Sequence, residues 1–269
     1  MRVDLHGAPQ TMLATLYAKA LDADEPDSLL NDTWARDIVA QIDYDWSATT
    51  ITRRTAPSVT IRSAHFDSWT KEFLAANRNA VVLHAGCGLD SRYFRIQPGD
   101  GVDWYDIDYP EVIALRRRFY PKTPGNHVIA ASATDPAWLS EIPDDRPALL
   151  IGEGLTMYLT KADGLALLRR VVGRFPSGEL QFDAFNWLGI KAQWTNSVVR
   201  RSGSTLHWAI DGPGDILDNV PGTRLLQWVP VFESDAFAAV PGIYRAMGAV
   251  MNRVPGLRTM SQFHRYAYG

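Results

Sequence analysis

The chain has 269 residues, 46% of them hydrophobic and 21% charged, which is the balance of a soluble globular protein with one large domain. Its net charge of −3 argues against a dedicated nucleic-acid-binding protein, because such domains usually carry a marked basic excess. A single cysteine, Cys87, excludes an internal disulfide, and the absence of a signal-peptide core or of any apolar run near about 18 residues predicts a cytoplasmic protein with no membrane partner.

Residues 1–79 are expected to form a helical cap. Apolar positions three and four apart predict helices over Thr11–Leu21 and Thr33–Ile42, with a turn signal between them at Asp22–Ser28. Residues Ile61–Asn77 have the pattern of a third, amphipathic helix. No linker separates this helix from the next segment, so the cap is predicted to belong to the main domain.

Residues 80–185 change to short apolar strands that alternate with helices. This alternation predicts right-handed crossovers and a mostly parallel sheet covered on both faces. The expected strands are Val81–Ala85, Val102–Ile107, His127–Ala131, Ala148–Gly152 and Glu179–Ala184. The expected helices between them are Leu89–Arg95, Pro110–Phe119, Trp138–Ile142 and Ala162–Phe175.

The alternation ends after the fifth predicted strand. Residues 186–222 are rich in tryptophan and contain one predicted helix, Leu188–Arg201; we expect them to form a substrate-side insertion over the active face. Residues 223–269 are expected to add two strands with a helix between them. These elements are Arg224–Phe232, Ile243–Asn252 and Thr259–Tyr268. The whole chain is therefore predicted to be a single domain.

The first predicted strand enters a glycine turn, Gly86-Cys87-Gly88, and helix-like spacing follows. Such a turn lets backbone approach a nucleotide-like ligand, and the free N–H groups at the helix start favour an anion. Ser91 replaces the third glycine of the dinucleotide fingerprint, which counts against a nicotinamide or flavin site.

Acidic side chains follow two of the predicted strands. Asp106 and Asp108 lie 20 and 22 residues after Gly86, where a carboxylate can accept both hydroxyls of a ribose. Solvated strand-end acids and a metal pair are the alternatives, and with no histidine partner nearby we predict no metal. Glu153 follows the fourth strand, at the edge where open α/β sheets bind ligands; the alternative is an acid at a helix start.

Three blocks of the sequence resemble the leucine carboxyl methyltransferase family, which includes the tetracenomycin-type polyketide O-methyltransferases. Gly86-Cys87-Gly88-Leu89-Asp90-Ser91-Arg92-x-x-Arg95 is similar to its Gly-x-Gly-Leu-Asp-Thr-Arg-x-x-Arg signature. Asp108-Tyr109-Pro110-Glu111-Val112 is similar to its Asp-aromatic/Leu-Pro-Glu-Val block, and Glu153-Gly154-Leu155-Thr156-Met157-Tyr158-Leu159 to its Glu-Gly-x-x-Met-Tyr-Leu block. The resemblance covers residues 11–185, with the blocks in the right order.

The resemblance implies an α/β, Rossmann-like class I methyltransferase that uses S-adenosyl-L-methionine. Its mostly parallel seven-stranded sheet would carry an N-terminal helical cap and a helical insertion after the fifth strand. The cofactor residues that the resemblance implies are Arg62, Gly86, Gly88, Asp90, Asp108, Ser132, Ala133 and Glu153.

The family also implies a role for most of these residues. The two glycines would lie against the methionine part, Asp108 would hold the ribose, and Glu153 would lie near the amino acid or sulfonium. Arg62 would pair with the methionine carboxylate, which suits the bidentate fork of a guanidinium. Ser132 and Ala133 stand where the family often has an Asp-Leu pair near the adenine.

Methyl transfer from a sulfonium is an in-line displacement, so the protein mainly has to hold the reacting atoms at about 3–3.5 Å. We expect the acceptor to be an oxygen, carboxylate or hydroxyl, of a small molecule that is a polyketide-like or other secondary metabolite. A phenol with a pKa of about 10 would benefit from a general base, whereas a carboxylate would not. His207 and Tyr158 are the predicted catalytic contacts, and His264 is a further candidate base.

Two other classes of protein remain open at this point. An NAD(P)-dependent oxidoreductase would share the sheet and Asp108. A non-catalytic module would bind the cofactor without turning it over. The oligomeric state is not predicted.

Overall fold

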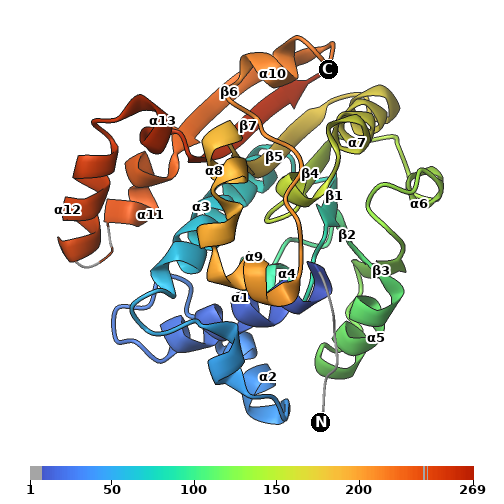
Figure 1. Cartoon of the computed structure of the whole chain (residues 1–269). Helices are drawn as coiled ribbons and strands as arrows, with labels where there is room; N and C mark the ends of the chain where they lie inside the picture. Colours follow the sequence, from blue (N-terminus) through green and yellow to red (C-terminus); the bar gives the residue numbers. More distant parts are fainter. Residues whose placement is uncertain (1–7, 239, 241) are drawn as a thin grey trace.

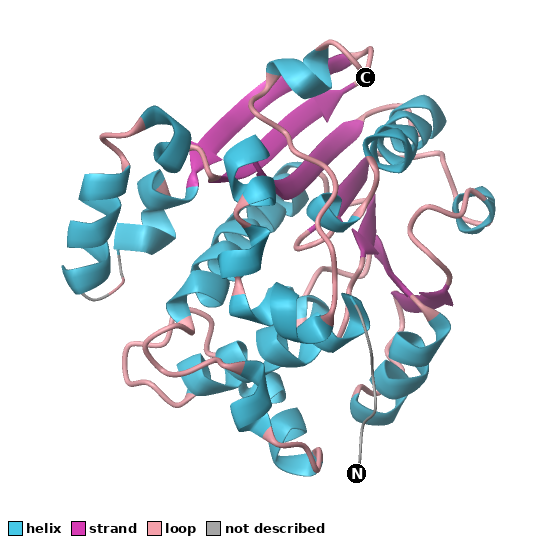
Figure 2. Cartoon of the chain, in the orientation of Figure 1, coloured by secondary structure: helices cyan, strands magenta, loops and turns pink. Residues whose placement is uncertain are grey.

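The computed structural model describes residues 8–238, 240 and 242–269, and its centre is one twisted seven-stranded sheet (Figures 1 and 2). The strand order is β3-β2-β1-β4-β5-β7-β6, with β7 antiparallel to both of its neighbours and the other pairs parallel. The mostly parallel seven-stranded sheet is therefore confirmed. The strands are β1 (Ala80–Ala85), β2 (Val102–Asp108), β3 (Asn126–Ala130), β4 (Ala148–Gly152), β5 (Gly178–Phe185), β6 (Thr223–Pro230) and β7 (Ser261–Tyr268).

Helices precede the sheet, alternate with its parallel strands, and occupy the segments before and after β6. Those of the first two groups are α1 (Ala8–Ala23), α2 (Thr33–Gln41), η1 (Trp46–Thr49), α3 (Pro57–Ala76), α4 (Arg92–Ile96), α5 (Pro110–Phe119), α6 (Ala137–Ser140), η2 (Thr156–Tyr158) and α7 (Lys161–Arg174). Those that follow β5 are α8 (Trp187–Lys191), η3 (Gln193–Thr195), α9 (Ser197–Ser202), α10 (Gly214–Leu217), η4 (Val231–Glu233), α11 (Asp235–Ala238), α12 (Gly242–Met251) and α13 (Pro255–Arg258).

Strand β1 is buried along its whole length, as expected of a central parallel strand. Its alternate residues face two separate cores. Val82 packs with Trp104 of β2 and Phe73 of α3, and α4 covers the same face of the sheet. Leu83 packs on the opposite face, which α6, α7 and α10 cover. The carboxyl ends of β1, β2 and β4 therefore meet at one edge of a rigid sheet.

The two N-terminal helices cover part of that edge. Leu16 of α1 and Ile38 of α2 share a core with Leu89, which follows the glycine turn, and with Tyr120 after α5. Helix α3 instead packs Phe66 against Phe263 of β7. The predicted cap thus includes two helices over the glycine turn and one that lines the sheet.

The single predicted helix Leu188–Arg201 is wrong, because the structure divides this segment into α8, η3 and α9. The side chain of Asn196 accepts hydrogen bonds from the N–H groups of Val198 and Val199, so it begins a new helix. Asn186 caps α8 in the same way, through the N–H of Gly189. Polar capping residues therefore outweigh the apolar spacing that suggested one continuous helix.

Across the described ranges, none of the helices combines the length and apolar character that crossing a membrane requires.

Candidate functional site

The glycine turn after β1 has a backbone that a side chain would disturb. Gly86 and Gly88 have φ angles of +67° and +52°, the left-handed region that favours glycine. A Cβ atom on Gly88 would lie 3.0 Å from Cγ of Met12, and one on Gly86 would lie 3.3 Å from Cδ1 of Leu155. The N–H of Gly86 donates to the carbonyl of Ile107 at 2.8 Å. The turn therefore lies at the carboxyl end of β2, and we call its closely packed backbone, Gly86–Gly88, the cradle.

Asp108 joins this cradle directly. Its Oδ2 accepts a hydrogen bond from the N–H of Gly88 at 2.7 Å, and its Oδ1 accepts one from the N–H of Tyr109 at 2.7 Å. Burial raises the pKa of Asp108, although these two backbone donors act in the opposite direction. Each oxygen retains capacity for a further donor, which is what two ribose hydroxyls require.

Asp106 points into the protein interior instead. It is fully buried and accepts hydrogen bonds from His84, Trp104, Asn126 and Arg116. Burial alone would raise its pKa, but the charge of Arg116 and the His84 hydrogen bond lower the pKa to about 2. The two acids of β2 thus face different surroundings, and no group of three or more potential metal ligands occurs in the part of the chain that the structure describes.

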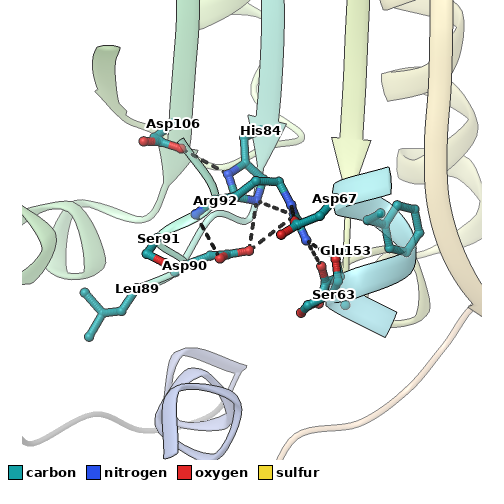
Figure 3. Close-up of polar contacts among 12 residues, drawn as sticks. Ser63, Asp67, His84, Leu89, Asp90, Ser91, Arg92, Asp106 and Glu153 are labelled. Atoms are coloured by element: carbon teal, nitrogen blue, oxygen red, sulfur yellow. Dashed lines mark hydrogen bonds and ion pairs between the residues drawn. The ribbon is translucent and has the colours of Figure 1, made fainter. Parts of the chain in front are cut away.

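Glu153, directly after β4, binds two arginines, Arg62 and Arg92. Figure 3 shows it beside Arg92 and Ser63. Its Oε1 accepts from Nε of Arg62 at 3.0 Å and from the hydroxyl of Ser63 at 2.7 Å, while Oε2 binds Nη2 of Arg92. Against the effect of burial, the charges of Arg92, Lys19 and Arg62 hold the pKa of Glu153 well below its usual range. Glu153 is therefore an ionised anchor for arginines.

Arg62 has a second carboxylate partner that the sequence did not indicate. Its Nη1 donates to Oδ2 of Asp183 on β5 at 3.0 Å, and Asp183 also accepts from the N–H of Gly154 at 2.6 Å. Its remaining nitrogen, Nη2, makes no hydrogen bond or ion pair with the described residues, and a Cβ on Gly154 would lie 3.2 Å from it. The glycine leaves this nitrogen accessible, and a carboxylate ligand fits there.

Asp90 is held among cations rather than exposed in the cradle. Nζ of Lys19 lies 3.0 Å from Oδ1, Nη1 of Arg95 lies 2.7 Å from the same oxygen, and Nη1 of Arg92 lies 3.2 Å from Oδ2. Figure 3 shows Asp90 facing Arg92, which also binds Asp67 on α3. Arg92 and Arg95 lie three residues apart on α4, and both belong to the Gly86–Arg95 block. That spacing is the feature of the sequence that could have predicted that both bind Asp90.

Ser132 and Ala133 follow β3 and lie beside the Asp108 strand end. The N–H of Ala131 donates to the backbone carbonyl of Asp108 at 2.9 Å. The hydroxyl of Ser132 lies 2.9 Å from that of Thr134, and the carbonyl of Ala133 accepts from the indole of Trp138 at 3.4 Å. This segment therefore lies at the same edge of the sheet as Asp108, and its contact with adenine stays a prediction.

The predicted catalytic side chains separate in the structure. Tyr158 in η2 is hydrogen-bonded to Thr11, close to Arg62 and Asp183, and burial raises its pKa. His207 is exposed, and its backbone N–H donates to the carbonyl of Met157 at 2.8 Å.

His264 is fully buried on β7. Its ring stacks on Phe182, and Nδ1 lies 2.8 Å from the hydroxyl of Tyr266. Burial lowers its pKa to about 3. The structure thus places Tyr158 near Arg62 and Asp183 and leaves His264 as a neutral core residue.

Comparison with known proteins decides the family. The leucine carboxyl methyltransferase model matches residues 11–172. The tetracenomycin polyketide synthesis O-methyltransferase TcmP of Streptomyces glaucescens is 39% identical over 266 residues, which cover 99% of this chain and 98% of that protein. This chain belongs to the leucine carboxyl methyltransferase family. It is an S-adenosylmethionine-dependent O-methyltransferase, and the oxidoreductase alternative is not favoured.

Other relatives agree with this family assignment. The S-adenosyl-L-methionine-dependent methyltransferase dpfgK of Gibberella zeae is 34% identical over 83% of this chain and 82% of its own length. A solved structure from Thermobifida fusca, described as a candidate methyltransferase, has a TM-score of 0.61 at 18% identity and covers 93% of this chain and 94% of its own. The latter likeness shows the shared class I fold.

The residues of this family member fit S-adenosylmethionine. The glycine turn leaves little room for side chains, Asp108 offers two acceptor oxygens beside it, and Nη2 of Arg62 is available at the same edge of the sheet. We call this edge, where β1, β2 and β4 end, the cofactor edge. When bound, the cofactor supplies a methyl group on a positively charged sulfur.

Proposed function

We propose that this enzyme methylates a carboxylate of a small, flat, polyketide-like molecule. The name of the family refers to the methylation of a carboxyl group. Its member TcmP, which aligns with 99% of this chain, is named for polyketide synthesis. The observation that carries the proposal is that two acids at this edge, Glu153 and Asp183, are bound to arginines. Glu153 and Asp183 both accept from Arg62, and Arg92 binds the other oxygen of Glu153.

A general base has to be free to take a proton. Burial raises the pKa of Tyr158, so this phenol is neutral near pH 7 and is not a base. His207 is on the surface and stays a predicted contact. A carboxylate acceptor is ionised at neutral pH and needs no base, which matches the titratable groups that the described residues place at this edge.

The chain's residues then mainly bind and orient. Arg62, fixed by Glu153 and Asp183, is proposed to hold the methionine carboxylate through Nη2. Asp108 is proposed to accept the ribose hydroxyls, and Met12 and Leu155 cover the two glycines. This pre-formed arrangement would reduce the entropy lost in bringing the two reactants together.

The experiment uses two matched acceptors, a hydroxyanthracene carboxylic acid and the same ring without the carboxyl group. Purified enzyme is incubated with methyl-labelled S-adenosylmethionine, and the products are treated with mild alkali. We expect labelled methyl only with the acid, in an ester that alkali cleaves. An alkali-stable aryl ether from either compound would contradict the carboxylate proposal.

The pH profile provides an independent readout. With a carboxylate acceptor, kcat/KM should stay level between about pH 6 and pH 9, because an acid of pKa about 4 is ionised throughout that range. A phenol acceptor would need a base instead. His207→Gln would then lower the rate by roughly 10²–10⁴-fold, and this result would overturn the proposal.

A further inference from the structure

Side chains of one helical segment hold three consecutive carbonyls of the glycine turn. Nη1 of Arg116, on α5, donates to the carbonyl oxygens of Gly88 at 3.2 Å and Asp90 at 2.7 Å. The hydroxyl of Tyr120, directly after α5, donates to the carbonyl of Leu89 at 2.8 Å. The backbone of the turn therefore has one orientation relative to α5. The predicted helix Leu89–Arg95 accordingly begins only at Arg92.

Arg116 is itself fixed in place. Its side chain is buried, its Nη2 donates to Oδ2 of Asp106 at 2.6 Å, and its guanidinium lies 4.5 Å from the ring centre of Tyr120. Asp106 is fully buried, so movement of Arg116 would leave a charged carboxylate without its cation. Arg116 and Tyr120 thus form one rigid unit, which we call the α5 clamp.

The α5 clamp and Asp108 belong to the same stretch of chain. Asp108 is the last residue of β2, and α5 begins at Pro110. The N–H of Gly88 donates to Oδ2 of Asp108, while the carbonyl of Gly88 accepts from Arg116. Gly88 is therefore held on both sides, and its two hydrogen bonds fix the direction in which its N–H meets the carboxylate.

We propose that Arg116 and Tyr120 are positioning residues that orient Asp108 toward the ribose hydroxyls of the cofactor, acting through the Gly88 backbone. This inference rests on the proposed role of Asp108 as the ribose acid. Glycine has wide backbone freedom, so Gly88 needs outside contacts to keep one conformation. Loosening the clamp weakens the ribose hydrogen bonds and leaves contacts to other parts of the cofactor unchanged.

The test separates the ribose hydroxyls from the rest of the ligand. Isothermal titration calorimetry measures Kd for S-adenosylhomocysteine and for its 2′,3′-dideoxy analogue, which lacks both hydroxyls. The Kd ratio is the Kd of the dideoxy analogue divided by the Kd of S-adenosylhomocysteine. We expect this ratio to be roughly tenfold or more in the wild type, because the lost hydrogen bonds are to a charged group. Tyr120→Phe, which removes only a hydroxyl, should lower the ratio by roughly threefold, with the Kd of the analogue unchanged. Arg116→Lys should lower it further.

Tyr268→Phe is the matched control. Tyr268 is also buried and donates to a carbonyl, that of Ala148 at 3.0 Å, at the amino end of β4. This variant loses a comparable hydrogen bond and should keep the wild-type Kd ratio. Thermal unfolding of each variant verifies that it is folded.

Two results would overturn the inference and are distinguishable from each other. Equal changes in both Kd values for Tyr120→Phe and Arg116→Lys would show a purely structural role. A Kd ratio unaltered by Asp108→Asn would show that Asp108 does not hold the ribose, which removes the basis of the clamp. Neither result affects the acceptor experiment, because that experiment follows the methylated product.

Discussion

Arg62 is a single residue whose guanidinium is held in one orientation by two acids. The carboxylates of Glu153 and Asp183 each accept a hydrogen bond from a different nitrogen of Arg62, both at 3.0 Å. Their opposite charges raise the pKa of Arg62 despite its burial, so the guanidinium stays charged. A guanidinium has several fixed donors, whereas an ammonium is a single point charge.

Arg62→Lys should therefore weaken S-adenosylhomocysteine binding selectively. One ammonium cannot reach both acids and a ligand carboxylate, so we expect Kd to rise by roughly 10- to 100-fold, about 1.4–3 kcal/mol. Calorimetry with 5′-methylthioadenosine, which lacks the amino-acid part, provides the control ligand. Equal weakening of both ligands would show that Arg62 acts on the fold and not on the methionine carboxylate.

At the scale of elements, the cofactor edge consists of short segments locked against one another. The turn after β1 packs under Met12 of α1 and is bonded to β2 and α5. The contact with Met12 leaves little room for a side chain on Gly88, and the backbone of Gly88 is left-handed. Gly88 is thus required for two reasons, the lack of space for a side chain and the left-handed backbone.

Gly88→Ala should lower both stability and cofactor affinity. A left-handed alanine costs about 1–2 kcal/mol, and its Cβ would displace Met12 in addition. Gly173→Ala is the matched variant, because Gly173 lies in α7 with no atom within 4 Å of the added Cβ. That change should stabilise by up to about 1 kcal/mol and leave binding unchanged. Urea unfolding and calorimetry measure the two effects; unaltered binding in Gly88→Ala would refute the close-approach role.

At the scale of the whole molecule, buried charges join the cap to the sheet. Lys19, Asp90, Arg92 and Arg95 bring α1 and α4 together, and Asp67 adds α3. Because these groups are buried, removing one partner leaves an uncompensated charge at a cost of roughly 3–5 kcal/mol. The network makes the cofactor edge dependent on protonation.

Stability should consequently fall on acidification in two stages. Burial lowers the pKa of His65 to about 4 and that of His264 to about 3. The unfolded chain takes up these protons near pH 6.5, so stability present above that pH is lost as pH falls toward 4. Arginine partners depress the pKa of Asp106 to about 2 and also lower that of Asp67, despite their burial. Their contribution is lost below about pH 4.

The measurement is the free energy of urea unfolding between pH 7.5 and pH 3. His264→Phe should reduce the slope between about pH 6 and pH 4 by up to 1.4 kcal/mol per pH unit, the value for one proton. Gly173→Ala is the control, because it removes no titratable group and should keep the slope. An unchanged slope in His264→Phe would contradict the assignment.

The sequence by itself determined most of the elements and the cofactor edge. The alternation and the runs of apolar residues are local patterns in the sequence. They located the strands from β1 to β7 and the glycine turn. Parallel strands end at one edge, so the sequence predicts that Asp108 and Glu153 lie at a common edge of the sheet. The sequence was misleading at Leu188–Arg201, where capping by Asn196 competes locally with apolar spacing.

Only the tertiary structure decided which side chains meet. The sheet order placed β7 between β5 and β6, and the two neighbouring acids of β2 acquired different surroundings, Asp106 among buried donors and Asp108 at the glycine turn. Arg62 and Asp183 are 121 residues apart along the chain. Such pairs depend on how separate elements pack and exclude water, and no local pattern in the sequence records that packing.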